Sequence, residues 1–339
     1  MDKLDKSELW AEPPEIEQPN IFPIEWRTET AKFVDLYEKA KRECWNPSDL
    51  PWTELDPGDF SSEQRLAIAY WFSVLANFDA SGPAVFARAL VHTYEQHEED
   101  PLRKCLFSIT RDEVNHEEFC QRAIQRLWPG APLNWEPKTK LEKLAVRNLK
   151  WLSYNGSRYW RGYQNAFGKY RMPVLFTSFF MGETAATTLF QHMAKNARHP
   201  LFQKGFQNVG RDEARHMAIT LHLFEKEAPR LSEEDKVQVT KQLRAGFVFL
   251  SMILYEPPEQ FWQLPPDFLQ VHRELEQVAR DAGLGVATLE TKRQVWYDAM
   301  LKVKGVAEKF DIEFPAMPEV GISGKEIVDL DEKSIIPVF

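Results

Sequence analysis

The chain has 339 residues, 43% of them hydrophobic and 13% aromatic, so it is long enough to bury one large core or two smaller ones. Its formal net charge of −9 argues against partners with anionic surfaces, namely nucleic acids and acidic lipid membranes. No apolar run approaches the ~20 residues that a membrane-spanning helix needs, and the first ten residues lack the apolar stretch of a secretory signal. Three cysteines without a CxxC pair suit neither a disulfide framework nor a zinc knuckle, so we expect a cytoplasmic protein.

Segments with helical periodicity follow one another along the chain, with almost no alternating strand pattern. The first 27 residues contain four prolines and are expected to form an extended arm. The predicted helices cover residues 28–43, 61–99 with a kink at Pro83, 102–127, 138–168, 172–197, 199–226 and 231–255. Tight joints before Pro173 and Pro200 predict antiparallel neighbours. Beyond them, two smaller helices are expected within 267–310, followed by a tail.

The sequence therefore predicts an all-α protein, in which four long helices enclose a core and further helices are added to them. We divide the chain into an N-terminal arm with a leading helix (residues 1–60), the helical bundle (61–256) and a C-terminal helical extension and tail (257–339).

One six-residue pattern occurs twice: residues 111–116 read Arg-Asp-Glu-Val-Asn-His, and residues 211–216 read Arg-Asp-Glu-Ala-Arg-His. Side chains three residues apart project from the same face of a helix, so Glu113 lies beside His116, and Glu213 beside His216. Composition alone would produce two such matches in about one chain in a thousand. The repeat favours two halves of a metal site over a metal-free helical binding module.

Two further acids lie in apolar helical segments. A two-metal carboxylate site in a helical bundle takes one more carboxylate from each of two other helices. Glu183, thirty residues before Glu213, shares its face with phenylalanines, and Asp79, thirty-four residues before Glu113, lies among apolar residues. Because an unpaired buried carboxylate is costly, we expect both to have a partner. For Asp79, capping of a broken helix is the alternative.

The predicted metal ligands are Asp79, Glu113, His116, Glu183, Glu213 and His216. Carboxylates mixed with imidazoles suit iron or manganese with open positions, rather than zinc or calcium. We expect two iron ions, with a manganese–iron pair as the alternative. Asp112 and Asp212 are placed to accept the second N–H of a ligand histidine on the opposite helix. A surface ion pair with Arg111 or Arg211 is the other interpretation.

Other polar residues are not assigned to the site. Residues 92–100 contain two histidines, but the segment is polar on every face and precedes Pro101, so it is predicted to be a solvated helix end. Glu117 and Glu118 are expected to be solvated as well. His192 is half a turn out of phase with Glu183 and is expected to be an ordinary polar or core residue. The phenylalanines around Glu183 are expected to be core residues, with lining of a substrate pocket as the alternative.

Over about residues 30–225 the sequence resembles the ferritin-like diiron-carboxylate superfamily, most closely the small subunit of class I ribonucleotide reductase and its oxidase relatives. The resemblance rests on residues 37–47, on Asp79 as first ligand, on Glu183 and on the two repeated motifs. It implies a ferritin-like bundle, a two-iron or mixed-metal centre, O2 as co-substrate and a homodimer. It also implies a separate electron donor such as a ferredoxin or a reductase. The sequence contains no nucleotide- or flavin-binding loop that would replace this donor.

Three features of the sequence indicate which branch of the superfamily the chain resembles. Radical-forming reductase subunits have a tyrosine one turn after the first metal-binding histidine, and here that position is Cys120, although Tyr163 or Tyr170 could approach in space. The tail, residues 327–339, is similar to a docking tail without matching one. Arylamine N-oxygenases have an extra histidine at the position of Val209. We therefore predict an oxidase or oxygenase that acts on a small organic substrate.

Two other functions remain as alternatives. The first is the radical-generating small subunit of a ribonucleotide reductase-like complex, which would need a large catalytic partner. The second is iron storage, for which the chain is longer than a minimal ferritin bundle.

Overall fold

The computed structural model describes residues 27–129, 136–166, 170–254, 256 and 261–327. These residues form helices and two isolated bridges, without a strand, which confirms the predicted all-α class. The predicted arm, apart from Arg27, and residues 328–339 of the tail lie outside the described residues. The division at residues 60 and 256 stays a prediction.

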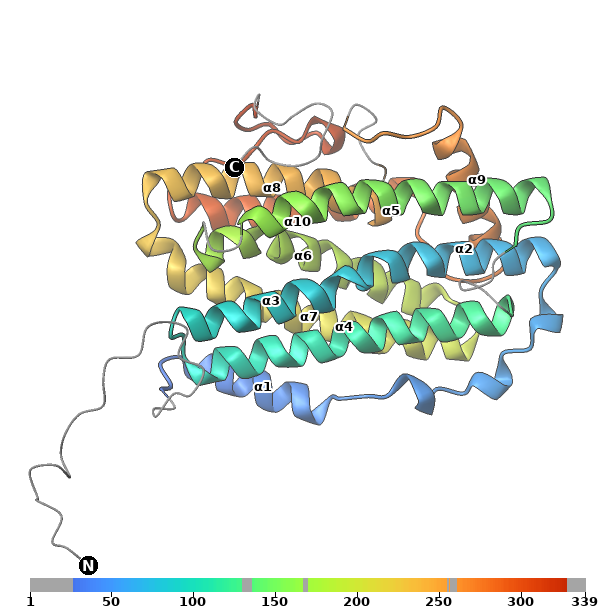
Figure 1. Cartoon of the computed structure of the whole chain (residues 1–339), viewed down its shortest axis with the longest axis horizontal. Coiled ribbons are helices and arrows are strands. Elements are labelled where there is room, and N and C mark those ends of the chain that lie inside the picture. Colours follow the sequence, from blue (N-terminus) through green and yellow to red (C-terminus); the bar gives the residue numbers. More distant parts are fainter. Residues whose placement is uncertain (1–26, 130–135, 167–169, 255, 257–260, 328–339) are drawn as a thin grey trace, which may run out of the picture.

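Ten α-helices lie within the described part of the chain. They are α1 (Ala31–Arg42), α2 (Ser62–Asp79), α3 (Ser81–Glu95), α4 (Asp100–Leu127), α5 (Lys140–Ala166), α6 (Met172–Asn196), α7 (Pro200–Glu227), α8 (Glu233–Leu254), α9 (Phe268–Asp281) and α10 (Leu289–Glu308). Most of the long helices run along the long axis of the molecule, and α3 continues the course of α2 (Figure 1). None of the described helices is both long and apolar enough to cross a membrane.

The four-helix core consists of the consecutive pair α2 and α3, together with α4, α6 and α7. α6 and α7 pack along one another, as the short joint before Pro200 predicts. On the outside, α1 packs against α4, α8 and α10 against α6, and α9 against α2. The helices that carry the predicted ligands, α2, α4, α6 and α7, are therefore core helices. The later helices α8, α9 and α10 cover two of them, α6 and α2.

The predicted single helix over residues 61–99 is in fact two helices, with the break at Ala80 rather than a kink at Pro83. Proline has no N–H, and its ring clashes with the carbonyl four residues earlier, which here belongs to Asp79. Pro83 is therefore accommodated in the first turn of a new helix. At the break, the hydroxyl of Ser81 donates to the carbonyl of Phe78 at 2.7 Å.

The other helix ends lie within four residues of the predicted ones. Pro101 was expected to lie before the helix predicted at 102–127, but it lies in the first turn of α4, where a missing N–H costs nothing. α2 begins with a capping box, in which Ser61 and Gln64 exchange side-chain and backbone hydrogen bonds.

Candidate metal centre

The two repeated motifs lie on α4 and α7, in the middle of the bundle, and bring their side chains to the same interior space. Glu113 and His116 project from α4, Glu213 and His216 from α7, and Glu183 from α6; all five are buried. Each of the three helices thus supplies acids to a region from which water is largely excluded.

Four of the six predicted ligands form a compact cluster. One ligand atom from each of Glu113, Glu183, Glu213 and His216 lies within 4.8 Å of the others. Nδ1 of His216 is 3.3 Å from both Glu113 Oε1 and Glu213 Oε2, and 3.9 Å from Glu183 Oε1. Nδ1 of His116 approaches Glu213 Oε1 at 3.6 Å. The carboxylate oxygens and the Nδ1 atoms of the two histidines therefore lie around one shared space.

Asp79 lies outside this four-residue cluster. It is the last residue of α2 and is partly exposed to a pocket that Glu113, Glu183 and Glu213 also line. Its carboxylate accepts a long hydrogen bond, 3.8 Å, from the thiol of Cys120. Burial raises the pKa of the Asp79 carboxyl well above its usual value. Its assignment as a ligand stays a prediction, as does that of the whole set.

The hydrogen bonding of the two histidines tests whether these residues suit a metal. Nε2 of His116 lies 3.3 Å from Asp212 Oδ2, and Nε2 of His216 lies 3.4 Å from Asp112 Oδ2. Nδ1 of each histidine is buried and makes no hydrogen bond, although it faces carboxylate oxygens. An imidazole that donates Nε2–H presents a lone pair at Nδ1, and such a lone pair beside carboxylates is stabilised by a cation between them. The donor set therefore fits a metal centre.

The titration behaviour of the cluster indicates excess negative charge. Burial raises the pKa of Glu183 well above its usual value, and the charge of Glu213 raises it further. Burial acts the same way on Glu213, but the neighbouring Glu183 carboxyl and the nearby imidazoles of His216 and His116 outweigh it and lower the pKa of Glu213 to about 2. Burial would lower the pKa of His116, yet the hydrogen bond to Asp212 and nearby carboxylates raise it to about 9. Protons thus neutralise the site, and a metal ion would replace them.

Arg215, in the second repeat, joins the two supporting aspartates. Its Nη2 donates to Asp112 Oδ2 at 2.6 Å and to Asp212 Oδ1 at 2.7 Å, and its Nη1 donates to Glu43 Oε2 at 3.0 Å. Trp45 donates from Nε1 to Asp212 Oδ2 at 2.7 Å. The aspartates are held on several sides and keep their charge in the interior.

The predicted contact of each aspartate with the histidine of the opposite helix is confirmed by these distances. The alternative is also partly right, because Arg111 Nη2 donates to Asp112 Oδ1 at 2.6 Å. That pair is not a surface ion pair, however, since Asp112 is fully buried. The roles of Glu43 and Trp45 were missed by the sequence analysis, since only the fold brings them to the repeat. The role of Arg215 was missed because it occupies a position at which the two repeats differ.

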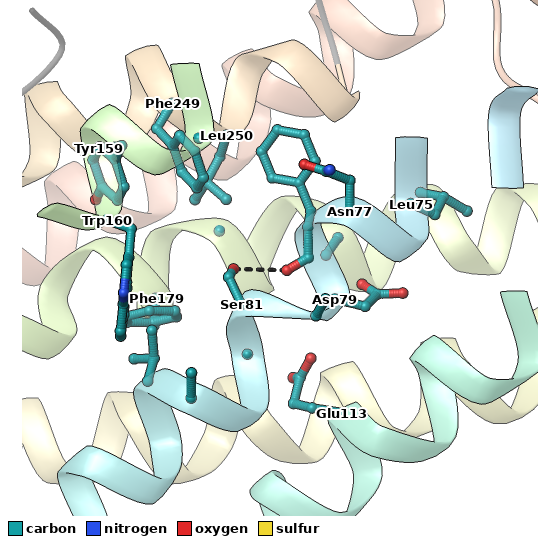
Figure 2. Close-up of a pocket in the computed structure, with 18 of the residues that line it drawn as sticks. Leu75, Asn77, Asp79, Ser81, Glu113, Tyr159, Trp160, Phe179, Phe249 and Leu250 are labelled. Atoms are coloured by element: carbon teal, nitrogen blue, oxygen red, sulfur yellow. Dashed lines mark hydrogen bonds between the residues drawn. The ribbon is translucent and has the colours of Figure 1, made fainter. Parts of the chain in front are cut away.

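A pocket of about 380 Å³ adjoins the cluster. Figure 2 shows Tyr159, Trp160 and Phe179 along one side of it, with Asp79 and Glu113 at another. Among the phenylalanines near Glu183, Phe179 and Phe190 line this pocket, whereas Phe176 and Phe180 are buried in the core. Both predicted roles for these rings therefore occur, on different residues.

The expectation that residues 92–100 form a solvated helix end is wrong for His92, Thr93 and Glu99, which are buried. The carboxylate of Glu99 accepts hydrogen bonds from the backbone N–H groups of Glu29 and Thr30. The segment preceding α1 folds over this helix end, and helical periodicity carries no information about such a distant cover. The segment contributes no atom to the four-residue cluster.

The remaining unassigned residues follow expectation. Glu117 and Glu118 are partly exposed, and Glu118 pairs with Arg122 at 2.7 Å. His192 is partly exposed and lies outside the cluster.

Comparison with known proteins shows which solved structures have a similar fold. Neither a scan of protein-family models nor a search of curated proteins found a match. Among solved structures, an R2-like ligand-binding oxidase with a reconstituted metal cofactor after photoconversion matches with a TM-score of 0.57 and 15% identity, over 84% of this chain and 94% of that one. The chain has the ferritin-like fold. The same oxidase with a Mn/Fe cofactor after a long soak gives a TM-score of 0.56 and 15% identity, over 85% and 94% of the two chains.

A glycine-to-phenylalanine mutant of that oxidase, also with a Mn/Fe cofactor, matches with a TM-score of 0.57 and 17% identity, over 85% of this chain and 98% of the other. The ferritin-like bundle is thus shared over nearly the full length of these neighbours, as the resemblance in sequence implies. At this identity the likeness concerns the fold, and function rests on the site itself.

Proposed function

We propose that the protein is an oxidoreductase whose two-metal carboxylate centre activates O2 and oxidises a small organic substrate. One observation carries the proposal: both buried histidines donate from Nε2 to an aspartate of the opposite helix and turn an unbonded Nδ1 toward a carboxylate. That the structural neighbours are oxidases with a Mn/Fe cofactor supports it further.

Two iron ions, or a manganese–iron pair, held by Asp79, Glu113, His116, Glu183, Glu213 and His216 would supply the redox chemistry with O2. The chain itself would do two things. Asp112 and Asp212 fix the tautomer and orientation of the histidines. The aromatic pocket excludes water and positions the substrate beside the carboxylates. Electrons are supplied by a separate ferredoxin or reductase, since the sequence offers no nucleotide- or flavin-binding loop.

A radical-generating subunit is the second candidate, and one observation favours it. Tyr159 and Tyr163 line the same pocket as the carboxylates, so a phenol is available although Cys120 replaces the tyrosine of the motif. The hydroxyl of Tyr163 donates to the carbonyl of Leu175. Co-purification with a large catalytic subunit would favour this candidate. By resemblance we also propose a cytoplasmic homodimer, which the molecular mass in solution tests.

Oxygen uptake is the direct test of the proposed activity. The iron-loaded protein should be nearly inert alone and should consume O2 once it is chemically reduced. Glu113→Ala should abolish this uptake, because it removes one carboxylate of the buried cluster. Glu118→Ala is the matched control, since Glu118 lies on the same helix and pairs with Arg122 at the surface. Equal uptake by wild type and Glu113→Ala would contradict the proposal.

A further inference from the structure

Aromatic rings form a large part of the wall of the pocket beside the cluster. Tyr159 and Phe249 stack face to face, with centroids 4.0 Å apart and planes 4° apart. Phe78 packs on Phe249 at 4.9 Å, and Tyr163 on Phe179 at 5.7 Å. These rings come from four different helices, α2, α5, α6 and α8. Flat rings in several orientations favour a planar ligand, because aromatic pairs gain energy beyond the area that they bury.

The ionisable side chains at the end of the pocket nearest the cluster are all carboxyls. Asp79, Glu113, Glu183 and Glu213 lie where the pocket meets the cluster, and none of the lining side chains that the structure describes is a lysine, arginine or histidine. An anionic group bound among the aromatic walls would lose its hydration without gaining a counter-ion, which is costly. The walls thus select against anions.

The outer part of the pocket offers neutral polar groups instead. Nδ2 of Asn77 donates to Ser153 Oγ at 2.6 Å, and Ser157 Oγ donates to the carbonyl of Ser153 at 2.8 Å. All three residues line the pocket. An uncharged polar substituent on a ligand can exchange hydrogen bonds with such amide and hydroxyl groups.

Three glycines line the pocket, and only one of them has room for a side chain. A Cβ at Gly82 would lie 2.5 Å from Glu113 Oε2, and a Cβ at Gly182 would lie 2.5 Å from Leu250 Cδ1. At Gly156, in the middle of α5, a Cβ would lie 3.9 Å from Asn77 Oδ1 and 4.0 Å from Phe249 Cε2, which are ordinary contacts. The empty space beside Gly156 is therefore part of the pocket.

We infer that this pocket binds an uncharged molecule with a planar aromatic ring, and that Gly156 sets the size of the ring system that it admits. The claim that such a molecule is the substrate rests on the proposed function. The claim that the pocket binds it depends on the aromatic walls and holds for the metal-free protein. Gly156 acts by leaving space between Asn77 and Phe249, so a larger residue there shortens the pocket without touching the acidic cluster.

The test measures binding of small probes to metal-free full-length protein by isothermal titration calorimetry. Phenol should bind about threefold to tenfold more tightly than cyclohexanol, which has the same size but no planar ring. Benzamide should bind at least about tenfold more tightly than benzoate, which carries an unpaired charge. Equal binding within either pair, or no binding of any probe, would overturn the assigned ligand class.

The role of Gly156 is tested with 2-naphthol as the larger uncharged probe. Gly156→Leu should weaken 2-naphthol at least about tenfold and phenol by less than about threefold, because the added side chain fills only part of the pocket. Gly156→Ala should weaken binding less than Gly156→Leu does, and again more for 2-naphthol than for phenol. Both residues favour a helix more than glycine does, so the fold is expected to be retained, as circular dichroism would check.

Gly305→Leu is the matched control, since Gly305 is also helical and has no atom within 4 Å of an added Cβ. It should leave both affinities unchanged. Equal effects of Gly156→Leu on phenol and 2-naphthol, or none on either, would overturn the role of Gly156. Metal content and O2 uptake, measured on the same preparations after metal loading, separate the two proposals. A protein that binds the aromatic probes but takes up no metal would refute only the proposed function. A protein that consumes O2 in a metal-dependent reaction but binds no aromatic probe would refute only this inference.

Discussion

His116 of α4 and Asp212 of α7 meet in the fully buried interior, with Nε2 and Oδ2 3.3 Å apart. The reverse pair, His216 of α7 and Asp112 of α4, meets at 3.4 Å. Each repeat therefore orients the histidine of the other, and Arg215 donates to both aspartates. The arrangement fixes which nitrogen of each histidine faces the carboxylates.

Asp212→Asn should weaken metal binding by about tenfold to a hundredfold, the usual effect of losing a group that orients a ligand histidine. Asp212 accepts hydrogen bonds from Trp45 and Arg215 as well as from His116, and an asparagine has only one oxygen to serve these donors. Competition with a chelator measures the affinity. Asp235→Asn, at the exposed start of α8, serves as the control. Affinities that match wild type in both variants would mean that Asp212 does not orient the histidine.

Much of the site could be predicted from the sequence because the chemistry is repeated in it. The spacing of Glu113 and His116, and of Glu213 and His216, determines which side chains share a helix face, and the copies meet as expected. Arg215 could not be predicted, since it occupies a position at which the repeats differ, where the first has Asn115.

Features that depend on packing between distant segments also could not be predicted from the sequence. The cover over Glu99 comes from residues about seventy positions earlier in the chain. The space at Gly156 depends on residues from α2 and α8. The helix break at Ala80 was predicted only approximately, because a proline constrains the turn before it as well as its own position.

Gly82→Ala should lower metal affinity by about tenfold or more while the bundle stays folded. A Cβ at this position would lie 2.5 Å from Glu113 Oε2 and 2.8 Å from its Cδ, so the carboxylate must move. Metal titration followed by absorption, with thermal unfolding as a check on folding, measures the effect. The control is Gly305→Ala, where an added Cβ meets nothing. Unchanged affinity in Gly82→Ala would show that the position of Glu113 is not critical.

The oxygen-treated iron protein should show no long-lived tyrosyl radical. Cys120 occupies the motif position of the expected tyrosine, and its thiol is buried beside Asp79. Electron paramagnetic resonance after desalting is the measurement. A persistent tyrosyl signal would favour the radical-generating subunit, and its loss in Tyr163→Phe would identify the residue that carries it.

His272 should make folding stability depend on pH. Burial, with the charges of Lys292 and Arg273, lowers its pKa from 6.5 to about 3. As the pH falls below 6.5 the unfolded chain gains a proton that the folded protein does not take up until about pH 3, so stability is lost over this range. The contribution is up to about 1.4 kcal/mol per pH unit.

His272→Gln should therefore have a shallower dependence of unfolding free energy on pH between 6 and 4, as denaturant titrations at several pH values would measure. Glutamine does not titrate and can still bond the hydroxyl of Tyr70, which lies 2.9 Å from Nδ1 of His272. Parallel pH profiles for the two proteins would rule out this role of His272.

Metal content tests the central claim most directly. Purified protein loaded with iron should contain about two ions per chain, as two-metal sites do. Glu183→Ala and His216→Ala should each lower that number, because both residues belong to the buried cluster. His222→Ala, on the same helix as His216 but paired with Glu225, should keep it. Two ions per chain in wild type and His222→Ala, with fewer in the cluster variants, is the predicted result; full loading in both cluster variants would contradict the assignment of the metal centre.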